Sequence, residues 1–174
     1  MIALRHPPPT EADIFEWAEA NPGYRFEYVN GEVTVSPTTG KSGVRQSELN
    51  QKLGAWAKAN GYQSFGSSTL FHFGGLLVSP DEALILAKRF GALSEEEQDE
   101  TVRIVPDVAV EIVSRSQGRG KLRGSVVPKC KAMSEAGVGY VLMLDPYAAI
   151  VDRVTLWGTP PPGFPTEWDD VLNA

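Results

Sequence analysis

Cysteine and histidine are scarce in this chain: Cys130, His6 and His72 are the only examples among 174 residues. A single cysteine excludes an intramolecular disulfide and fits a reducing compartment, so we expect a cytoplasmic protein. A zinc site of the usual cysteine and histidine type cannot be assembled from one such chain. Any metal would be held by oxygen atoms, which favours Mg²⁺, with Mn²⁺ as the alternative.

Long apolar runs and the common cofactor motifs are also missing. No stretch approaches the roughly 18 apolar residues of a membrane span, and residues 1–9 have no apolar core of the kind found in export signals. We therefore expect no membrane association. The absence of GxGxxG, Walker A and G-x-S-x-G patterns argues against nucleotide-binding and serine-hydrolase folds.

Positive charge is in deficit, with a net charge of −6 and a pI of about 5.0. This balance argues against a protein that coats nucleic acid nonspecifically. It does not exclude a nuclease, because metal-binding carboxylates are acidic themselves and a bound cation restores the local positive potential.

Hydrophobic periodicity predicts a mixed α/β protein. A capping box at Thr10 opens a first helix, and Asn30-Gly31 joins two alternating runs into a β-hairpin. The remaining predicted elements are a helix over 44–60, two or three strands between 62 and 86, a short solvated helix or loop at 94–100, a buried strand over 105–113, a helix after the glycine-rich loop 117–124, and strands over 140–144 and 150–157.

This order predicts one domain spanning residues 1–174, with a central mixed β-sheet flanked by helices. It contains too few crossovers for a Rossmann arrangement. From about residue 158 the chain is rich in proline, and we expect this arm to run extended over the surface.

Three carboxylates are predicted to lie in or beside apolar strands, where a charge is costly. Glu27 lies between Phe26 and Tyr28, Asp81 precedes an apolar run, and Glu111 interrupts the run 108–113. Each could instead face water at a strand end or pair with an arginine. That alternative is about as good as the functional one for Glu27, whereas the position of Glu111 favours function.

Phosphodiester hydrolysis would explain why such acids converge at one site. A divalent ion held by carboxylates lowers the pKa of the attacking water and neutralises the phosphate, and a nearby lysine completes the electrostatics. Lys129 is the best candidate for this role, although a helix lysine on its own is more often solvated.

A basic segment follows the Glu111 strand. Residues 112–134 contain no acid, and the cations that precede the next helix are candidate nucleic-acid contacts: Arg115, Arg119, Lys121 and Arg123. A partner-binding or simply solvated loop explains this segment equally well.

Several of these segments, taken together and in order, resemble a known family. They are Arg25 to Glu32 with Ser36-Pro37, Ser79-Pro80-Asp81, Pro106 to Ser114, Ala136-Gly137-Val138 and Leu144-Asp145-Pro146. The chain resembles, from roughly residue 11 to 157, the Uma-type putative restriction endonuclease family of the PD-(D/E)XK nuclease superfamily.

The resemblance implies a restriction-endonuclease-like α/β fold and a Mg²⁺-dependent site. Glu27, Asp81 and Glu111 match the acids of that site, with Asp81, Glu111 and the carbonyl of Ile112 as metal ligands. Ser114 and Ser116 match the serines that follow the strand.

The resemblance fixes the lysine of the site less directly than it fixes the acids. The commonest superfamily pattern places lysine where this chain has Val113, and in the Uma-type family it moves to the next helix. Lys129 matches the position of the family's lysine when residues are counted back from Gly137, whereas Lys121 and Lys131 are alternatives. Pro128 suggests that this helix starts late.

A second Pro-Asp pair is a weaker candidate than Asp81. Asp107 lies four residues before Glu111 on the same predicted strand, about 13 Å away at standard rise, which is too far to share one ion.

Three hypotheses follow. The first is a Mg²⁺-dependent endonuclease that cuts DNA, and the second is a degenerate nuclease-like domain that binds nucleic acid or a protein without cutting. The third is an oligomerisation module in which Phe164 and Trp168 of the arm pack on a neighbouring subunit, although packing on their own core is the simpler alternative. By analogy with nucleases that act on two strands, we also expect a homodimer.

Overall fold

The computed structural model describes residues 7–114 and 123–174. The helices are α1 (Glu11–Ala20), α2 (Gly40–Asn60), α3 (Ala87–Phe90), α4 (Glu95–Asp99), α5 (Arg123–Glu135) and α6 (Asp169–Leu172), with a 3₁₀ helix η2 (Ile150–Asp152). The strands are β1 (Tyr24–Val29), β2 (Glu32–Pro37), β3 (Tyr62–Gly66), β4 (Phe71–Phe73), β5 (Leu76–Val78), β6 (Glu82–Leu86), β7 (Val108–Ile112), β8 (Tyr140–Leu144) and β9 (Val154–Gly158).

The strands form two sheets, whereas the sequence predicted one. The first has the order β2-β1-β5-β4 and the second has the order β3-β6-β7-β8-β9. Four strands lie between residues 62 and 86 because the segment 71–78 folds into its own hairpin, β4–β5, which pairs with β1 through Tyr28 and Leu77. Strands of three residues are too short to give an alternating pattern in the sequence.

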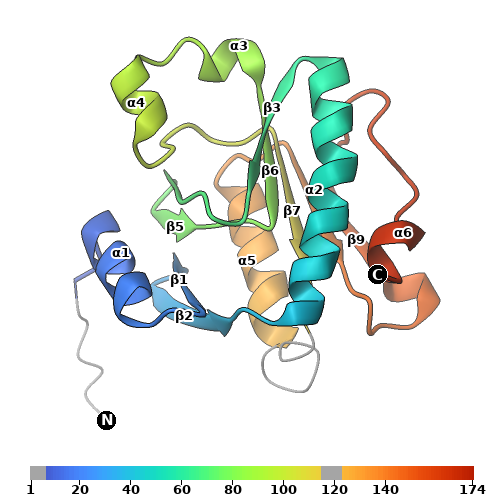
Figure 1. The fold of residues 1–174 in the computed structure, drawn as a ribbon, viewed down its shortest axis with the longest axis horizontal. Coiled ribbons are helices and arrows are strands. Elements are labelled where there is room, and N and C mark those ends of the chain that lie inside the picture. The colour runs from blue at the N-terminus through green and yellow to red at the C-terminus, as the bar shows by residue number, and fades with distance from the viewer. Residues whose placement is uncertain (1–6, 115–122) are drawn as a thin grey trace.

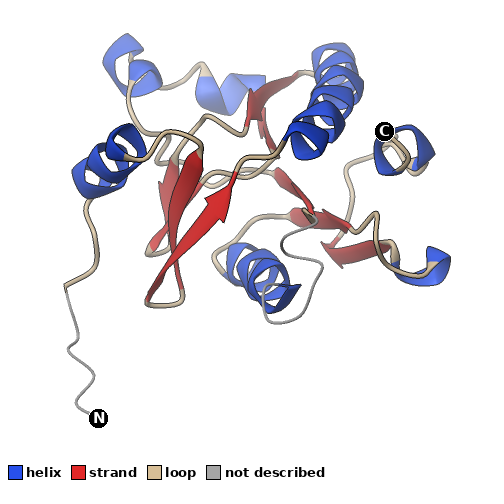
Figure 2. Cartoon of the chain, turned by 60° about the horizontal axis from the view of Figure 1, so that its bottom comes forward, coloured by secondary structure: helices blue, strands red, loops and turns tan. Residues whose placement is uncertain are grey.

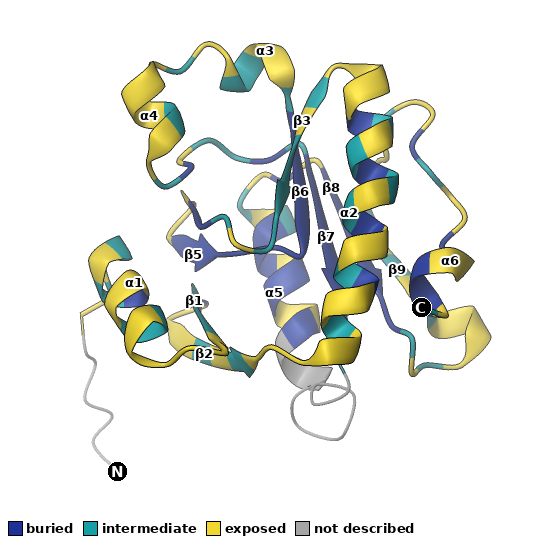
Figure 3. Ribbon diagram, in the orientation of Figure 1, coloured by how far each residue is buried: buried dark blue, intermediate teal, exposed yellow. Residues whose placement is uncertain are grey.

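The five-stranded sheet is mixed and covered on both faces (Figures 1 and 2). Strands β7 and β8 are parallel and joined through α5, while the other neighbouring pairs are antiparallel. Leu49 and Leu53 of α2 pack on one face, and Cys130 and Met133 of α5 pack on the other. Every residue of β7 and β8 is buried, as Figure 3 shows. The prediction of a mixed α/β sheet flanked by helices is confirmed.

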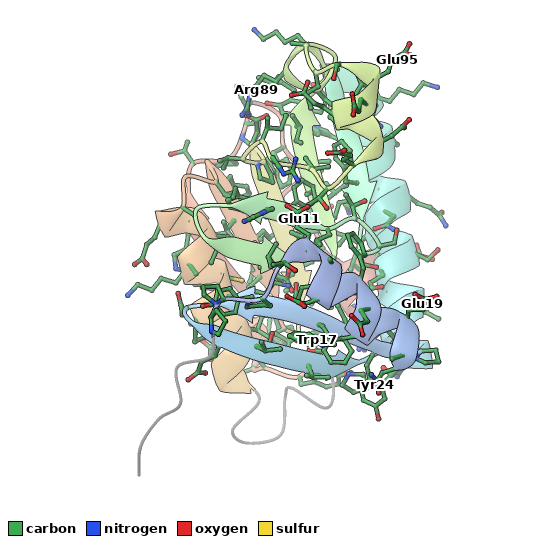
Figure 4. All side chains as sticks on the ribbon, turned by 90° about the vertical axis from the view of Figure 1, so that its left-hand side faces the viewer. Glu11, Trp17, Glu19, Tyr24, Arg89 and Glu95 are labelled. Atoms are coloured by element: carbon green, nitrogen blue, oxygen red, sulfur yellow. The ribbon has the colours of Figure 1, made fainter. Side chains whose placement is uncertain are left out.

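The β1–β2 hairpin turns at Asn30-Gly31, as predicted. Both residues have positive φ, 52° and 84°, as a type I′ turn requires. Helix α1 lies across this hairpin (Figure 4), and the Trp17 and Phe26 rings contact each other with centroids 6.0 Å apart. One face of the hairpin is thus covered by α1, which leaves Glu27 on the opposite face.

Helix α5 starts earlier than Pro128 suggested. It begins at Arg123, so Pro128 lies inside the helix, where it cannot donate to the carbonyl four residues earlier. The predicted last strand is also shorter, because residues 150–152 form η2 and β9 starts only at Val154.

The proline-rich arm does not simply run over the surface. Phe164, Trp168 and Val171 are buried in the cluster formed with α2, and Trp56 Nε1 donates to the Gly163 carbonyl at 2.7 Å. Aromatic anchors therefore fold the arm back onto its own core. Across residues 7–114 and 123–174, none of the helices combines the length and apolar character that a membrane crossing needs.

Candidate active site

One pocket collects the four residues that the sequence singled out. It lies between the open face of the β1–β2 hairpin, the start of α2, the ends of β6 and β7 where Asp81 and Glu111 lie, and α5. Its lining includes Glu27, Asp81, Glu111 and Lys129, together with Ile112. The four ionisable side chains are each no more than 6% exposed. They are therefore buried charges and not surface groups.

Lys129 lies between two of the acids. Its Nζ is 2.7 Å from Glu27 Oε1 and 2.7 Å from Glu111 Oε1. The same nitrogen is 3.5 Å from the Ser79 carbonyl, and the Ser79 N–H donates to Glu27 Oε1 at 2.7 Å. Lys129 reaches this position because it shares the sheet-facing side of α5 with Val126, Cys130 and Met133.

Asp81 is fixed by donors on three sides. Its Oδ2 accepts from the Ile112 N–H at 2.8 Å, while its Oδ1 accepts from Arg25 Nη1 at 3.1 Å and from Gln46 Nε2 at 2.5 Å. The first bond ties Asp81 to the residue next to Glu111. Since the N–H and C=O of one strand residue point to the same side, the Ile112 carbonyl faces the side of Asp81.

Mutual proximity shifts the pKa values of this cluster. Burial raises the pKa of Glu111, Lys129 opposes that rise, and the charges of Asp81 and Glu27 add to it, so the pKa remains above its ordinary value. Burial alone would lower the pKa of Lys129, but Glu111 and Glu27 raise it. The pKa of Arg25 is likewise raised, because Asp81 and the two glutamates outweigh burial. Both bases therefore stay charged at neutral pH.

The arrangement differs from three acids converging on a single gap. Lys129 fills the space between Glu27 and Glu111, and among the described residues no three acidic, histidine or cysteine side chains gather as a metal cluster. The predicted ligand set of Asp81, Glu111 and the Ile112 carbonyl still fits a hard cation. All three supply oxygen, and Mg²⁺ is commonly held by one or two carboxylates with water completing the shell. The only cation that contacts Glu111 within the described chain is Lys129, which it shares with Glu27.

Sequence reasoning missed two residues that support Asp81, namely Arg25 and Gln46. Arg25 could have been found, because it lies two residues before Glu27 and so on the same face of β1. Gln46 is a polar residue in the pocket wall near the start of α2, and Ser67 Oγ donates to its Oε1 at 3.2 Å. A glutamine in a helix gives no comparable signal in the sequence.

The remaining candidates are placed as follows. Lys131 is exposed, with its Nζ 3.7 Å from Glu135, so it does not share the site of Lys129. Asp107 binds Arg89 and the Leu86 N–H and is not part of the pocket lining. Ser114 lines the pocket. The positions Arg115, Ser116, Arg119 and Lys121 lie outside the described residues, and Arg123 is the first residue of α5.

Hydroxyl groups also line the pocket. Strand β2, the segment after it and the first turn of α2 contribute five of them: Thr34, Ser36, Thr38, Thr39 and Ser42. Such groups can donate to phosphate oxygens without adding charge.

The model of the Uma2 family, described as putative restriction endonucleases, matches residues 12–159. The chain belongs to the Uma2 family. No curated protein matches it.

A solved structure shares the fold seen here. It is a putative nuclease belonging to DUF820 from Anabaena variabilis ATCC 29413, 18% identical in sequence, with a TM-score of 0.65. The match covers 86% of this chain and 90% of that one. The two chains therefore share a fold over nearly their whole length.

Proposed function

We propose that this Uma2 protein is a Mg²⁺-dependent endonuclease that hydrolyses phosphodiester bonds of DNA. The observation that carries the proposal is the contact of the Lys129 ammonium with both Glu27 and Glu111, in a pocket that also contains Asp81. Buried ionisable groups with perturbed pKa values that share a cleft are candidates for a functional site, and phosphodiester chemistry uses all of these groups.

The side chains have distinct roles in this proposal. Asp81, Glu111 and the Ile112 carbonyl would hold the ion, which would neutralise the phosphate and lower the pKa of water. Lys129 orients the attacking water and faces the negative charge that develops on phosphorus-bound oxygen. Glu27 positions the Lys129 ammonium. The water oxygen forms the new bond to phosphorus as the bond to the ester oxygen breaks, while the water gives up one proton to solvent and the leaving oxygen takes one up from solvent.

Substrate contacts would come from neutral and basic groups outside this cluster. The pocket hydroxyls of β2 and early α2 can contact phosphate and sugar, and the basic stretch with Arg115, Arg119, Lys121 and Arg123 can follow the DNA backbone. We propose that the protein works in the cytoplasm, where its one cysteine stays reduced, and as a homodimer, because duplex DNA offers two strands.

One feature separates cutting from mere binding, namely whether a lysine reaches the acids. The 2.7 Å contacts of Lys129 favour an enzyme over a degenerate domain. A purely structural module is disfavoured because Glu27, Asp81 and Glu111 line one pocket and do not diverge onto separate faces.

A plasmid cleavage assay tests the proposal. The purified protein should nick or linearise supercoiled plasmid with Mg²⁺ or Mn²⁺ and should be inactive in EDTA. Glu111→Gln should lower the rate by at least about a hundredfold, because the ion that would stabilise transition-state charge is then no longer held in place. The matched control is Glu95→Gln, since Glu95 lies exposed in α4 (Figure 4) and should leave the rate unchanged. Equal cleavage by the Glu111 variant, or by wild type in EDTA, would reject the proposed site.

A further inference from the structure

Strand β9 forms one edge of the five-stranded sheet and exposes apolar side chains. Val154 is 38% and Leu156 is 55% exposed, and just before the strand Ile150 and Val151 are 83% and 87% exposed. The opposite side of β9 is covered, because Trp157 packs against the cluster that contains α5. Exposed aliphatic residues grouped on one segment commonly mark an interaction site.

The hydrogen-bonding pattern shows which backbone groups of β9 are free. The Asp145 N–H donates to the Arg153 carbonyl at 2.8 Å, and the Thr159 N–H donates to the Gly139 carbonyl at 3.4 Å. Odd-numbered residues of β9 therefore face β8, and even-numbered ones point away from it. These are Val154, Leu156 and Gly158, all three exposed. Within the part of the chain that the structure describes, no strand lies beyond them.

This edge lacks the features that usually prevent strands from associating. Residues 154–158 contain no charged residue and no proline, and their register with β8 is unbroken by a bulge. Natural proteins normally place lysine, proline or a bulge at a long open edge. The segment 150–158 carries one acid and one base, Asp152 and Arg153, so two copies would not repel each other.

We propose that β9 pairs with β9 of a second copy of this chain, in antiparallel orientation about a twofold axis at Leu156. This register places Leu156 opposite its own counterpart and Val154 opposite Gly158, so all three outward-facing residues are used. An identical antiparallel strand is self-complementary, and a twofold contact closes on itself without extending into a fibre. The two five-stranded sheets would then form one continuous sheet, with the exposed Val154 and Leu156 side chains of both copies on the same face.

Cross-linking tests the register. In a hydrogen-bonded antiparallel pair the facing Cα atoms are about 5.5 Å apart, a distance that a disulfide spans. Leu156→Cys should therefore form a covalent dimer rapidly on mild oxidation, at least about tenfold faster than Val154→Cys, whose two copies would lie about 14 Å apart. The native Cys130 is fully buried and does not compete.

Sedimentation equilibrium of the full chain tests the association itself. The wild type should sediment as a dimer of 18.9 kDa subunits. Leu156→Pro removes an N–H that points away from β8, so the fold should persist while Kd for the dimer rises at least about tenfold. Val35→Lys on β2, an edge strand of the four-stranded sheet, should leave Kd unchanged. A monomeric wild type, or equal cross-linking of Leu156→Cys and Val154→Cys, would overturn the proposal even if Leu156→Pro failed to fold. The result is independent of nuclease activity.

Discussion

Lys129 contacts Glu27 and Glu111, while Arg25 contacts Asp81, so every acid of the pocket has a cation within 3.1 Å. Three acids face two bases, which leaves the fully ionised cluster with one negative charge in excess. Such buried pairs contribute little net stability, but losing one partner costs about 3–5 kcal/mol because it leaves a charge uncompensated. The cluster is thus expensive to maintain for stability alone, which is consistent with a functional role.

Glu82, next to Asp81 in the sequence, carries a separate pH dependence. It is buried on the α2 side of the sheet, and with the Asn50 amide turned so that its nitrogen faces the acid, Asn50 donates to Glu82 Oε2 at 2.5 Å. Burial, with a smaller effect from Asp81, raises the pKa of Glu82 from 4.5 to about 8. Between these values the folded chain keeps a proton that the unfolded chain has lost, so this residue makes stability fall as pH rises.

Glu82→Gln should remove that dependence, because the amide does not ionise. The free energy of unfolding in urea should fall more for wild type than for Glu82→Gln between pH 5 and pH 8, as judged by the difference between the two curves. Curves that stay parallel across this range would show that Glu82 is already ionised in the folded protein.

The three acids could be singled out from the sequence because each has an unusual setting: Glu27 and Glu111 interrupt apolar strands, and Asp81 follows a proline. Lys129 could be assigned only through the family resemblance, counted back from Gly137, because a helix lysine on its own is more often solvated. Gln46 could not be inferred, because a polar residue near the start of a helix is ordinary. Its role depends on the tertiary contact with Asp81 across 35 residues of sequence.

Among the elements, β9 ends in a turn that demands glycine. Gly158 has φ of +85°, and a Cβ built there would lie 2.1 Å from the Gly139 carbonyl oxygen. That contact brings the chain after β9 close to the start of β8. Backbone atoms cannot move aside as a flexible side chain would.

Gly158→Ala should therefore lower the free energy of unfolding by more than the cost of its left-handed backbone conformation alone. Gly31 is a matched control, since its φ is +84° and a Cβ there meets nothing within 4 Å among the described residues. Gly31→Ala should cost about 1–2 kcal/mol, the usual penalty of a left-handed conformation, and Gly158→Ala at least about 2 kcal/mol more. Equal losses in urea unfolding of the two variants would refute the close approach.

Element prediction succeeded where local chemistry decides and failed where tertiary packing does. The capping box at Thr10 and the Asn30-Gly31 turn satisfy their own hydrogen bonds and were found in place. The predicted start of α5 was wrong because Pro128 is tolerated inside the helix. The prediction of an extended surface arm was wrong because Phe164 and Trp168 contribute burial energy that outweighs the extended preference of the prolines around them.

At the scale of the whole molecule, the two-sheet arrangement creates the pocket. The β1–β2 hairpin uses Phe26 and Tyr28 to pack beneath α1, and this turns Glu27 toward the ends of β6 and β7. A single sheet, as the sequence suggested, would have left no wall opposite Asp81 and Glu111. Which sheet a short strand joins depends on contacts distant in sequence, so the composition of 71–78 could not reveal it.

Mn²⁺ binding followed by electron paramagnetic resonance tests, without reference to a substrate, the proposal that Asp81 and Glu111 together hold one divalent cation. The wild type should bind one Mn²⁺ per chain, competed by Mg²⁺, and Asp81→Asn should weaken binding at least about tenfold, since even loss of an outer partner of a metal ligand costs that much. Asp99→Asn, exposed at the end of α4, should bind as wild type does. Unaltered Mn²⁺ affinity in Asp81→Asn would contradict the account.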